Sequence, residues 1–455
     1  MAEISVIDRD DRRQERGLGN VAYWLAAGAA LLALVAPALW NGFPLIFPDT
    51  GGYLQRPITG TLELGRSALY GVFLIPGAPL AFWPNIVVQS GLVVWLIALT
   101  LRVHKIGGRA WLLLGIVVIL AVITSLPWFV SQMMPDILFP AGVLALYLLV
   151  FGGDDIRTIE RIGLGATIAF AICSHMAFMG VALGLVAALL IAGLLKNFPR
   201  PRFAAAGIAL AGGLLLAPVS NLAVTGHFAF TPGGISFLFN RLVEDGIVSR
   251  YLDDVCPDPT LRICPYRTQI AGYGYDDWLW RNSTPFTKLG GWKDYSSEER
   301  RIVLATLARY PAEQIENAVA HSAEQFVSFA TAITADNDRN FHVIWTFKDY
   351  LPALYPALME ARQQNGGLDV KPLNWIHIPA GSLAMLGLAA VLLWRRRLDL
   401  PPQAAALAAT VLLALIVNAA VCGVFSHASN RYQSRLMPLA PLAMMIVLVG
   451  RRRVC

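Results

Sequence analysis

The chain consists of apolar runs that are each close to the length of one membrane-spanning helix, and this pattern limits the possible folds more than any other feature. A helix needs about 20 mainly apolar residues to cross the hydrocarbon core of a bilayer. With 56% hydrophobic and 15% charged residues, the chain has more apolar surface than a soluble protein can bury. We therefore predict an all-α polytopic membrane protein. The ten predicted spans are Val21–Trp40, Pro84–Val103, Trp111–Trp128, Ile137–Phe151, Ile162–Cys173, Phe178–Leu195, Phe203–Thr225, Ile376–Trp394, Ala404–Val424 and Leu436–Val449.

Basic residues between these runs orient the chain. With ten spans, every cluster of arginine and lysine falls on one side of the membrane, and positive charge is retained on the cytoplasmic side. Both termini are then predicted to be cytoplasmic. The net charge of +6 is explained by these orientation signals, so we expect no nucleic-acid partner. The clusters are Arg9–Arg16, Arg102–Arg109, Arg157–Arg161, Lys196–Arg202, Arg395–Arg397 and Arg451–Arg453.

The first run could instead belong to a cleaved signal peptide, since Ala36-Pro37-Ala38 loosely resembles a cleavage site. However, a run of about 20 apolar residues is longer than the usual signal core, and acidic residues dilute the positive charge before it. We expect an uncleaved anchor, and cleavage stays the alternative. The acidic residues are Asp8, Asp10, Asp11 and Glu15.

Three segments are predicted to lie outside the cytoplasm. Residues 41–83 and 425–435 connect spans, whereas residues 226–375 have the composition of a soluble domain and should form a mixed, mainly helical cap between the seventh and eighth spans. The chain then divides into an N-terminal membrane module of residues 1–225, the cap of residues 226–375 and a C-terminal membrane module of residues 376–455. The proline-interrupted stretch Ser67–Trp83 should lie in the interface or re-enter, because another crossing would invert the charge pattern.

Within the cap, helices are predicted to begin at Ser296 and at Pro311. In the second of these, apolar residues recur every three or four positions, which is typical of one face of an amphipathic helix. That face could pack on the cap or lie along the membrane surface. It consists of Ile315, Val319, Ser322, Phe326 and Phe329.

The positions of the cysteines indicate whether the predicted cap lies in an oxidising compartment. Cys256 and Cys264 both fall in the predicted cap, where a disulfide between them would fit an oxidising environment. Two free thiols are the alternative. Cys173 and Cys422 fall within spans and are expected to be ordinary small apolar residues.

Two carboxylates lie at the outer ends of predicted spans. Asp49 follows the first span in Pro48-Asp49-Thr50-Gly51-Gly52, and Asp136 opens the fourth. A carboxylate held against the bilayer is partly desolvated and more basic, which suits a general base acting on a hydroxyl. Each also has a structural alternative, because Asp49 could cap a turn and Asp136 could stabilise a helix N-terminus. Because both acids are predicted to lie on the same side of the membrane, we expect them to belong to one site.

Arg431 and Arg435 lie in or beside the last outer segment and contradict the positive-inside trend. Because they are four residues apart they share one helical face, and guanidinium groups match the oxygens of a phosphate. We predict a lipid-phosphate site, with simple anchoring among lipid headgroups as the alternative. His175 is expected to be a hydrogen-bonded or snorkelling histidine and not a catalytic one, and Asp336-Asn337-Asp338 is expected to be a turn.

In their order and sidedness, these motifs resemble those of the GT-C superfamily of integral membrane glycosyltransferases. An acidic first outer loop and a large outer loop after the seventh span match as well. The matching segments are Pro48–Tyr53 after the first span, Gly65–Leu74 in the same loop, Pro135-Asp136 at the fourth span and Arg431–Pro438 near the end.

The resemblance implies that a sugar is transferred from a polyprenyl-phosphate carrier to a hydroxyl of a glycan, lipid or protein acceptor. It places the protein in a bacterial inner membrane with its active site facing the periplasm. Asp49 would be the catalytic base, Asp136 an acid that contacts the acceptor or a metal, and Arg431 or Arg435 the ligands of the carrier phosphate. No cofactor is certain, although a Mg²⁺ or Mn²⁺ ion held by the two acids is compatible with it. The further binding residues would be Tyr53, Arg66 and His427.

Three other classes stay open. A transporter or lipid flippase should carry ionisable residues in mid-span and repeated halves, and neither is visible in the sequence. Another membrane transferase, moving an acyl or phosphoryl group, would use His175 or His427 as its base. A non-catalytic assembly protein with an outer cap is the third class.

Overall fold

The structure is a computed structural model, and it describes residues 2–61, 68–196, 198–230, 233–281, 283–332 and 341–451. Across these ranges the chain is helical and contains no strand beyond one isolated bridge. The predicted turn at Asp336–Asp338 lies outside the described residues.

Seven helices among the described residues are long and apolar enough to cross a membrane, so the chain is a multi-pass integral membrane protein. Each of them coincides with a predicted span. They belong to α1 (Ala2–Asn41), α4 (Trp83–Val103), α9 (Met176–Gly193), α10 (Ala204–Thr225), α21 (Asn374–Leu393), α22 (Pro402–Phe425) and α23 (Asn430–Ser434) with α24 (Leu439–Arg451).

The other three predicted spans are helices of fewer than 18 residues, namely α5 (Ala110–Ile123), α7 (Leu138–Phe151) and α8 (Thr158–Ser174). The prediction of one helix over Trp111–Trp128 is wrong in its second half. Thr124 is extended, and α6 (Leu126–Val130) begins after it. A continuous helix would press the ring of Pro127 against the carbonyl of Ile123. The predicted break after α8 is confirmed, because His175 is extended there.

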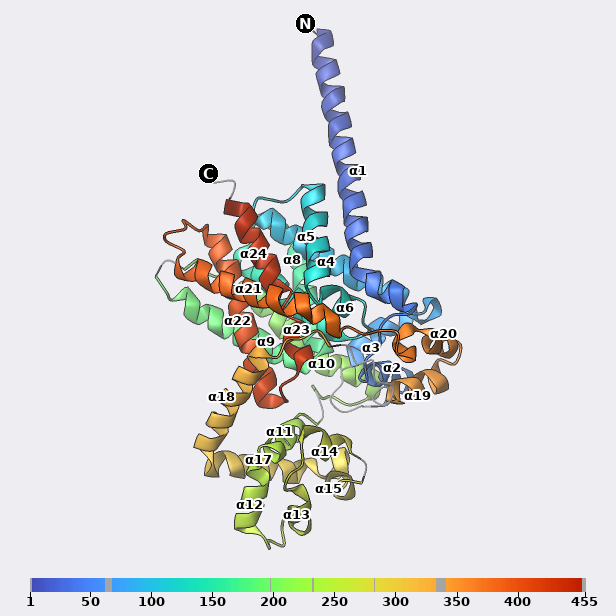
Figure 1. Cartoon of the computed structure of the whole chain (residues 1–455), viewed down its shortest axis with the longest axis vertical. Coiled ribbons are helices and arrows are strands. Elements are labelled where there is room, and N and C mark those ends of the chain that lie inside the picture. The colour runs from blue at the N-terminus through green and yellow to red at the C-terminus, as the bar shows by residue number, and fades with distance from the viewer. Residues whose placement is uncertain are drawn as a thin grey trace.

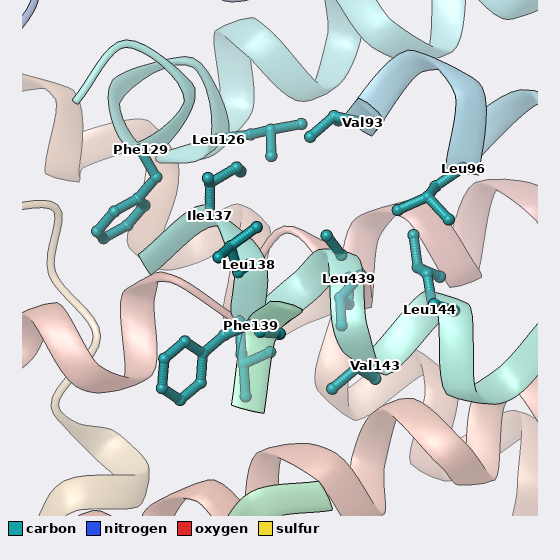
Figure 2. Packing of buried hydrophobic residues seen from close by; sticks show 14 of the residues in the cluster. Val93, Leu96, Leu126, Phe129, Ile137, Leu138, Phe139, Val143, Leu144 and Leu439 are labelled. Carbon is teal, nitrogen blue, oxygen red and sulfur yellow. The ribbon is translucent and has the colours of Figure 1, made fainter. Parts of the chain in front are cut away.

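Helix α7 forms the centre of the bundle. All its side chains from Leu138 to Val150 are buried, as expected for a helix that is apolar on every face. Figure 2 shows residues of α4, α6 and α24 around it, among them Val93, Leu126 and Leu439. The short helix η2 (Pro135–Ile137) leads into α7. The central position of α7 therefore fixes where Asp136 lies.

The outer segment, residues 226–375, is divided between two apolar cores. Residues Gly234–Arg309 enclose an apolar core of their own, with Phe239, Trp278 and Tyr295 fully buried in it. Figure 1 shows this part beyond one end of the bundle, while both termini lie at the other end. Its helices are α11 (Gly234–Glu244), α12 (Ile247–Val255), α13 (Arg267–Ile270), α14 (Tyr275–Trp280), α15 (Pro285–Lys288), α16 (Gly291–Asp294) and α17 (Ser296–Arg309).

Cys256 and Cys264 form a disulfide within this outer part, with their Cα atoms 5.7 Å apart. The helix starts predicted at Ser296 and Pro311 are confirmed by α17 and by α18 (Pro311–Val327).

Helix α18 leads from the outer core back to the bundle and packs on α22. Gly423 of α22 is required at their crossing, because a Cβ atom there would lie 2.6 Å from the carbonyl oxygen of His321. Ile315 and Val319 are exposed, so this apolar face does not pack on the outer core. The remaining outer helices lie against the bundle and share its core through Val343, Phe347 and Leu358; they are α19 (Phe341–Tyr350) and α20 (Tyr355–Glu360).

Helices α2 (Thr50–Thr59), α3 (Ala68–Leu74) and η1 (Ile75–Leu80) fill the first outer loop. Tyr70 and Leu74 are fully buried there. The described part of the stretch predicted to lie in the interface is thus a short helical segment that joins the bundle core.

A buried acid makes the outer core sensitive to pH. Glu299 of α17 accepts a hydrogen bond from Ser236 Oγ, and burial raises the pKa of its carboxyl from 4.5 to about 7. The folded state therefore binds more protons than the unfolded state between these values. Stability from this group is complete below pH 4.5 and is lost as the pH rises through 7. Since one pKa unit is worth about 1.4 kcal/mol, the loss is on the order of 3 kcal/mol.

We expect residues 234–310 of the full-length protein to exchange amide hydrogens more slowly at about pH 5 than at about pH 8, after correction for intrinsic rates. Glu299→Gln should remove this difference, whereas Glu316→Gln, which alters an exposed acid of α18, should keep it. An unchanged pH dependence in Glu299→Gln would show that another group titrates.

Candidate functional site

Two loops that carry the predicted acids run side by side. The backbone N–H of Leu45 donates to Ser131 O at 2.9 Å, and the N–H of Met133 donates to Leu45 O at 2.8 Å. Thr50 Oγ1 donates to Met133 O at 3.1 Å and accepts from the N–H of Phe47. This pairing joins the loop after α1 to the loop before η2. It therefore brings Asp49 and Asp136 to one place.

Asp49 lies directly before α2, but its side chain makes no capping bond to that helix. The alternative role as a turn cap is therefore not supported. Gly51, two residues later, allows α19 to lie against α2, because a Cβ atom there would lie 2.7 Å from His342 Nδ1. Packing against α19 thus accounts for one glycine of the Thr-Gly-Gly sequence.

Arg431 joins the two acids. Its Nη2 lies 2.6 Å from Asp136 Oδ2 and its Nε lies 3.2 Å from Asp136 Oδ1, which is a two-pronged ion pair. Its Nη1 lies 3.3 Å from Asp49 Oδ2. Arg435 Nη1 also donates to Asp136 Oδ1, at 3.1 Å. We call Asp49, Asp136, Arg431 and Arg435 the four-charge cluster.

The cluster is buried at one side and open at the other. The side chains of Asp136 and Arg435 are 0% exposed, that of Arg431 is 8% exposed and that of Asp49 is 25% exposed. Arg435 is covered by the ring of Phe139, whose centroid is 3.3 Å from its Cζ, and Arg431 by the ring of Phe47 at 3.9 Å. Asp49 is therefore the member that a substrate can reach.

Further contacts of Arg435 explain its position. Its Nη2 donates to Asn418 Oδ1 and to Cys422 Sγ of α22, both at 3.4 Å. Cys422 is thus a contact of the cluster, a role that the sequence did not indicate. The prediction of a phosphate ligand does not fit Arg435 as well as Arg431, because Arg435 has no exposed surface.

Helix α18 positions the segment that delivers Arg431. The side-chain amide of Gln325 donates to Ser429 O at 2.9 Å and accepts from the N–H of Ser429 at 2.8 Å. The N–H of Ala330 donates to Asn430 Oδ1 at 3.0 Å. The outer segment and the last outer loop are therefore joined next to the cluster.

Two of the other predicted binding residues, Tyr53 and His427, lie near the cluster and are not part of the ion pairs described above. Tyr53 is buried in α2, with its ring 5.2 Å from that of Tyr70 and its hydroxyl 3.5 Å from Ser174 O. The ring of His427 packs edge-on against Tyr432 at 5.6 Å. Arg66 lies outside the described residues.

His175 has the structural role that the sequence predicts. Its Nδ1 accepts a hydrogen bond from the N–H of Ala177 and so caps α9. Its ring packs edge-on against Phe139 at 5.1 Å, on the ring that also covers Arg435. It therefore contributes to the wall that holds the cluster.

Two glutamines that the sequence analysis did not single out hold the acidic loops. Gln89 Nε2 donates to Val130 O and Gln132 O, and its Oε1 accepts from the hydroxyl of Tyr70. Gln363 donates to Ile46 O and accepts from its N–H. A polar Gln89 in the middle of a predicted span was a usable signal, because a buried polar side chain needs partners. Nothing in the sequence linked Gln363 to the first loop.

The charges of the cluster balance, with two carboxylates and two guanidinium groups. The cation between Asp49 and Asp136 is Arg431, so these acids do not face each other as metal ligands. Across the described ranges, no three His, Cys, Asp or Glu side chains are placed to share an ion. This arrangement does not fit the Mg²⁺ or Mn²⁺ site that the resemblance allowed.

No protein-family model, no curated protein and no solved structure matches this chain.

Proposed function

We propose that this protein is an integral membrane glycosyltransferase that moves a sugar from a polyprenyl-phosphate carrier to an acceptor hydroxyl at the extracytoplasmic face. The observation that carries the proposal is the contact between a partly exposed carboxylate, Asp49, and a buried guanidinium, Arg431. A base beside a phosphate-binding cation provides what transfer from a phosphate carrier needs. In Figure 1, α2, which begins directly after Asp49, and α23, which contains Arg431, lie between the end of the bundle with both termini and the outer helices α11–α17.

In the proposed reaction, Asp49 accepts the proton of the acceptor hydroxyl as the hydroxyl oxygen bonds to the anomeric carbon of the sugar. The bond between that carbon and the carrier phosphate oxygen breaks, and its electron pair leaves with the phosphate. Arg431 offsets the negative charge that develops there. No step uses a metal ion or a nucleotide.

The unequal contacts of Arg431 suggest how the base becomes active. Its distance to Asp49 is 3.3 Å, whereas its shortest distance to Asp136 is 2.6 Å. An incoming phosphate would compete for the guanidinium at its longer contact, the one to the partly exposed Asp49. Asp49 would then lose its contact with Arg431 and become a stronger base when the donor is bound. Asp136 and Arg435 are fully buried, and we assign them to positioning Arg431.

Ten spans give the topology that this function requires. Both termini lie at one end of the bundle, which calls for an even number of crossings (Figure 1). Seven long helices alone give an odd number, so the proposal counts α5, α7 and α8 as three further crossings and Ala68–Leu80 as a segment that does not cross. The positive-inside pattern then places the cluster on the extracytoplasmic side.

Single cysteines should report this topology. In a Cys455→Ser background, Thr61→Cys and Glu316→Cys should react with an impermeant maleimide added outside intact cells, and Arg157→Cys and Arg396→Cys should react only after permeabilisation. Cys173 and Cys422 are buried and should give little background. Labelling of Arg396→Cys from outside would overturn the orientation.

A direct assay tests the activity. Purified protein in nanodiscs is incubated with polyprenyl-phosphate-linked sugars and a mixture of cell-envelope acceptors, and the release of free polyprenyl phosphate is measured. We expect release that requires both donor and acceptor. Movement of the carrier between leaflets without sugar release would instead indicate a flippase.

A further inference from the structure

A second charged site lies at the end of the bundle opposite the four-charge cluster. It is a cavity of about 220 Å³ between the end of α7, the segment after α9 and the start of α22. Pockets for drug-sized ligands usually measure about 300–1,000 Å³, so this one suits a small polar group. The lining includes Phe151, Pro199, Arg200, Arg202 and Gln403.

Positive charge exceeds negative charge around this cavity. Arg202 Nη1 and Arg161 Nη2 both lie 3.9 Å from Asp154 Oδ1, and the Asp154 side chain is 97% exposed. The next acid along the chain, Asp155, already pairs with Lys105. Two arginines thus share one carboxylate, and Arg200, which also lines the cavity, adds a further positive charge. Such a surplus favours an anionic ligand, and arginine matches phosphate oxygens in particular.

The cavity has a fixed wall and an apolar border. The backbone N–H of Arg202 donates to Val150 O at 3.1 Å, which ties the arginine segment to α7. Just before this segment, Ile191, Leu194 and Leu195 at the end of α9 are all more than half exposed. A molecule with a phosphate and apolar chains can therefore contact the arginines and this border together. Basic pockets between helices on the cytoplasmic side are typical sites for anionic lipid headgroups.

We propose that this cavity binds the phosphate of an anionic phospholipid headgroup, with Arg200 and Arg202 as its ligands. The site is separate from the four-charge cluster and does not depend on the proposed glycosyl transfer. Inorganic phosphate shares the same chemistry, and the border formed by α9 favours the lipid.

The test uses full-length protein in neutral detergent, with phosphatidylglycerol, phosphatidylcholine or inorganic phosphate added separately. Binding is measured by native mass spectrometry and by the shift in Tm. Arg200→Gln/Arg202→Gln should weaken phosphatidylglycerol binding by roughly tenfold or more. Arg396→Gln/Arg397→Gln removes the same charge from two exposed positions just after α21 and serves as the matched control.

The proposal stands if the control binds phosphatidylglycerol like the wild type and phosphatidylcholine has no effect. Protection by inorganic phosphate that depends on the same two arginines would keep the phosphate site and identify free phosphate as its source. Equal losses in both double variants, or wild-type binding in Arg200→Gln/Arg202→Gln, would overturn it. Arg200 is exposed, so the single variant Arg200→Gln replaces the double variant if the latter fails to fold.

Discussion

Replacing Asp49 by Asn should lower the rate of sugar transfer by about 10²–10⁴-fold while the protein stays folded in the membrane. Asparagine keeps the shape of the side chain and can still accept a hydrogen bond from Arg431, but it cannot take up the proton of the acceptor hydroxyl. Because the Asp49 side chain is the most exposed of the four-charge cluster, we expect only a small change in stability.

The measurement compares kcat of purified Asp49→Asn and wild-type protein, with Tm and binding of the lipid-phosphate donor as checks on folding. Asp253→Asn is the matched control, since it removes an exposed acid of α12, away from both proposed sites. If Asp49→Asn folds and transfers sugar at nearly the wild-type rate, Asp49 is not the base and the proposed mechanism fails.

Replacing Asp136 by Asn should destabilise the protein by about 3–5 kcal/mol, because it leaves buried guanidinium charge without its main partner. Asp136 is 0% exposed and contacts both Arg431 and Arg435. Asn418 and Cys422 are neutral and cannot replace its charge. The expected result is a large fall in Tm or in the yield of folded protein, before any effect on catalysis can be measured.

The double variant Asp136→Leu/Arg435→Met separates loss of charge from loss of shape. Replacing both members of a buried ion pair by apolar residues of similar volume is often close to neutral. We therefore expect the double variant to unfold at a higher denaturant concentration than Asp136→Asn. Wild-type stability of Asp136→Asn would mean that the cluster is not held by buried ion pairs.

The sequence alone determined the class of the fold and singled out four charged residues that the structure brings together. Length and hydropathy located the seven long helices, because every backbone group in lipid must be satisfied within its own helix. The predicted spans also left a break between α8 and α9 at His175. The end of α5 at Ile123 was not predicted, although Pro127 indicated that the helix ends before it. The site residues were found because charged groups at the ends of apolar runs are uncommon and costly.

The tertiary structure decided which of these charges meet and which of them a substrate can reach. Asp136 and Arg431 are 295 residues apart, and no periodicity connects them. The central position of α7 and the Gln325 contacts of α18 hold these two residues together, and the bridge at Leu45 brings Asp49 to the same place. The same packing buries Arg435 and leaves Asp49 at the surface. Hydropathy is a property of neighbours along the chain, whereas the pairing of buried charges depends on segments brought together by folding.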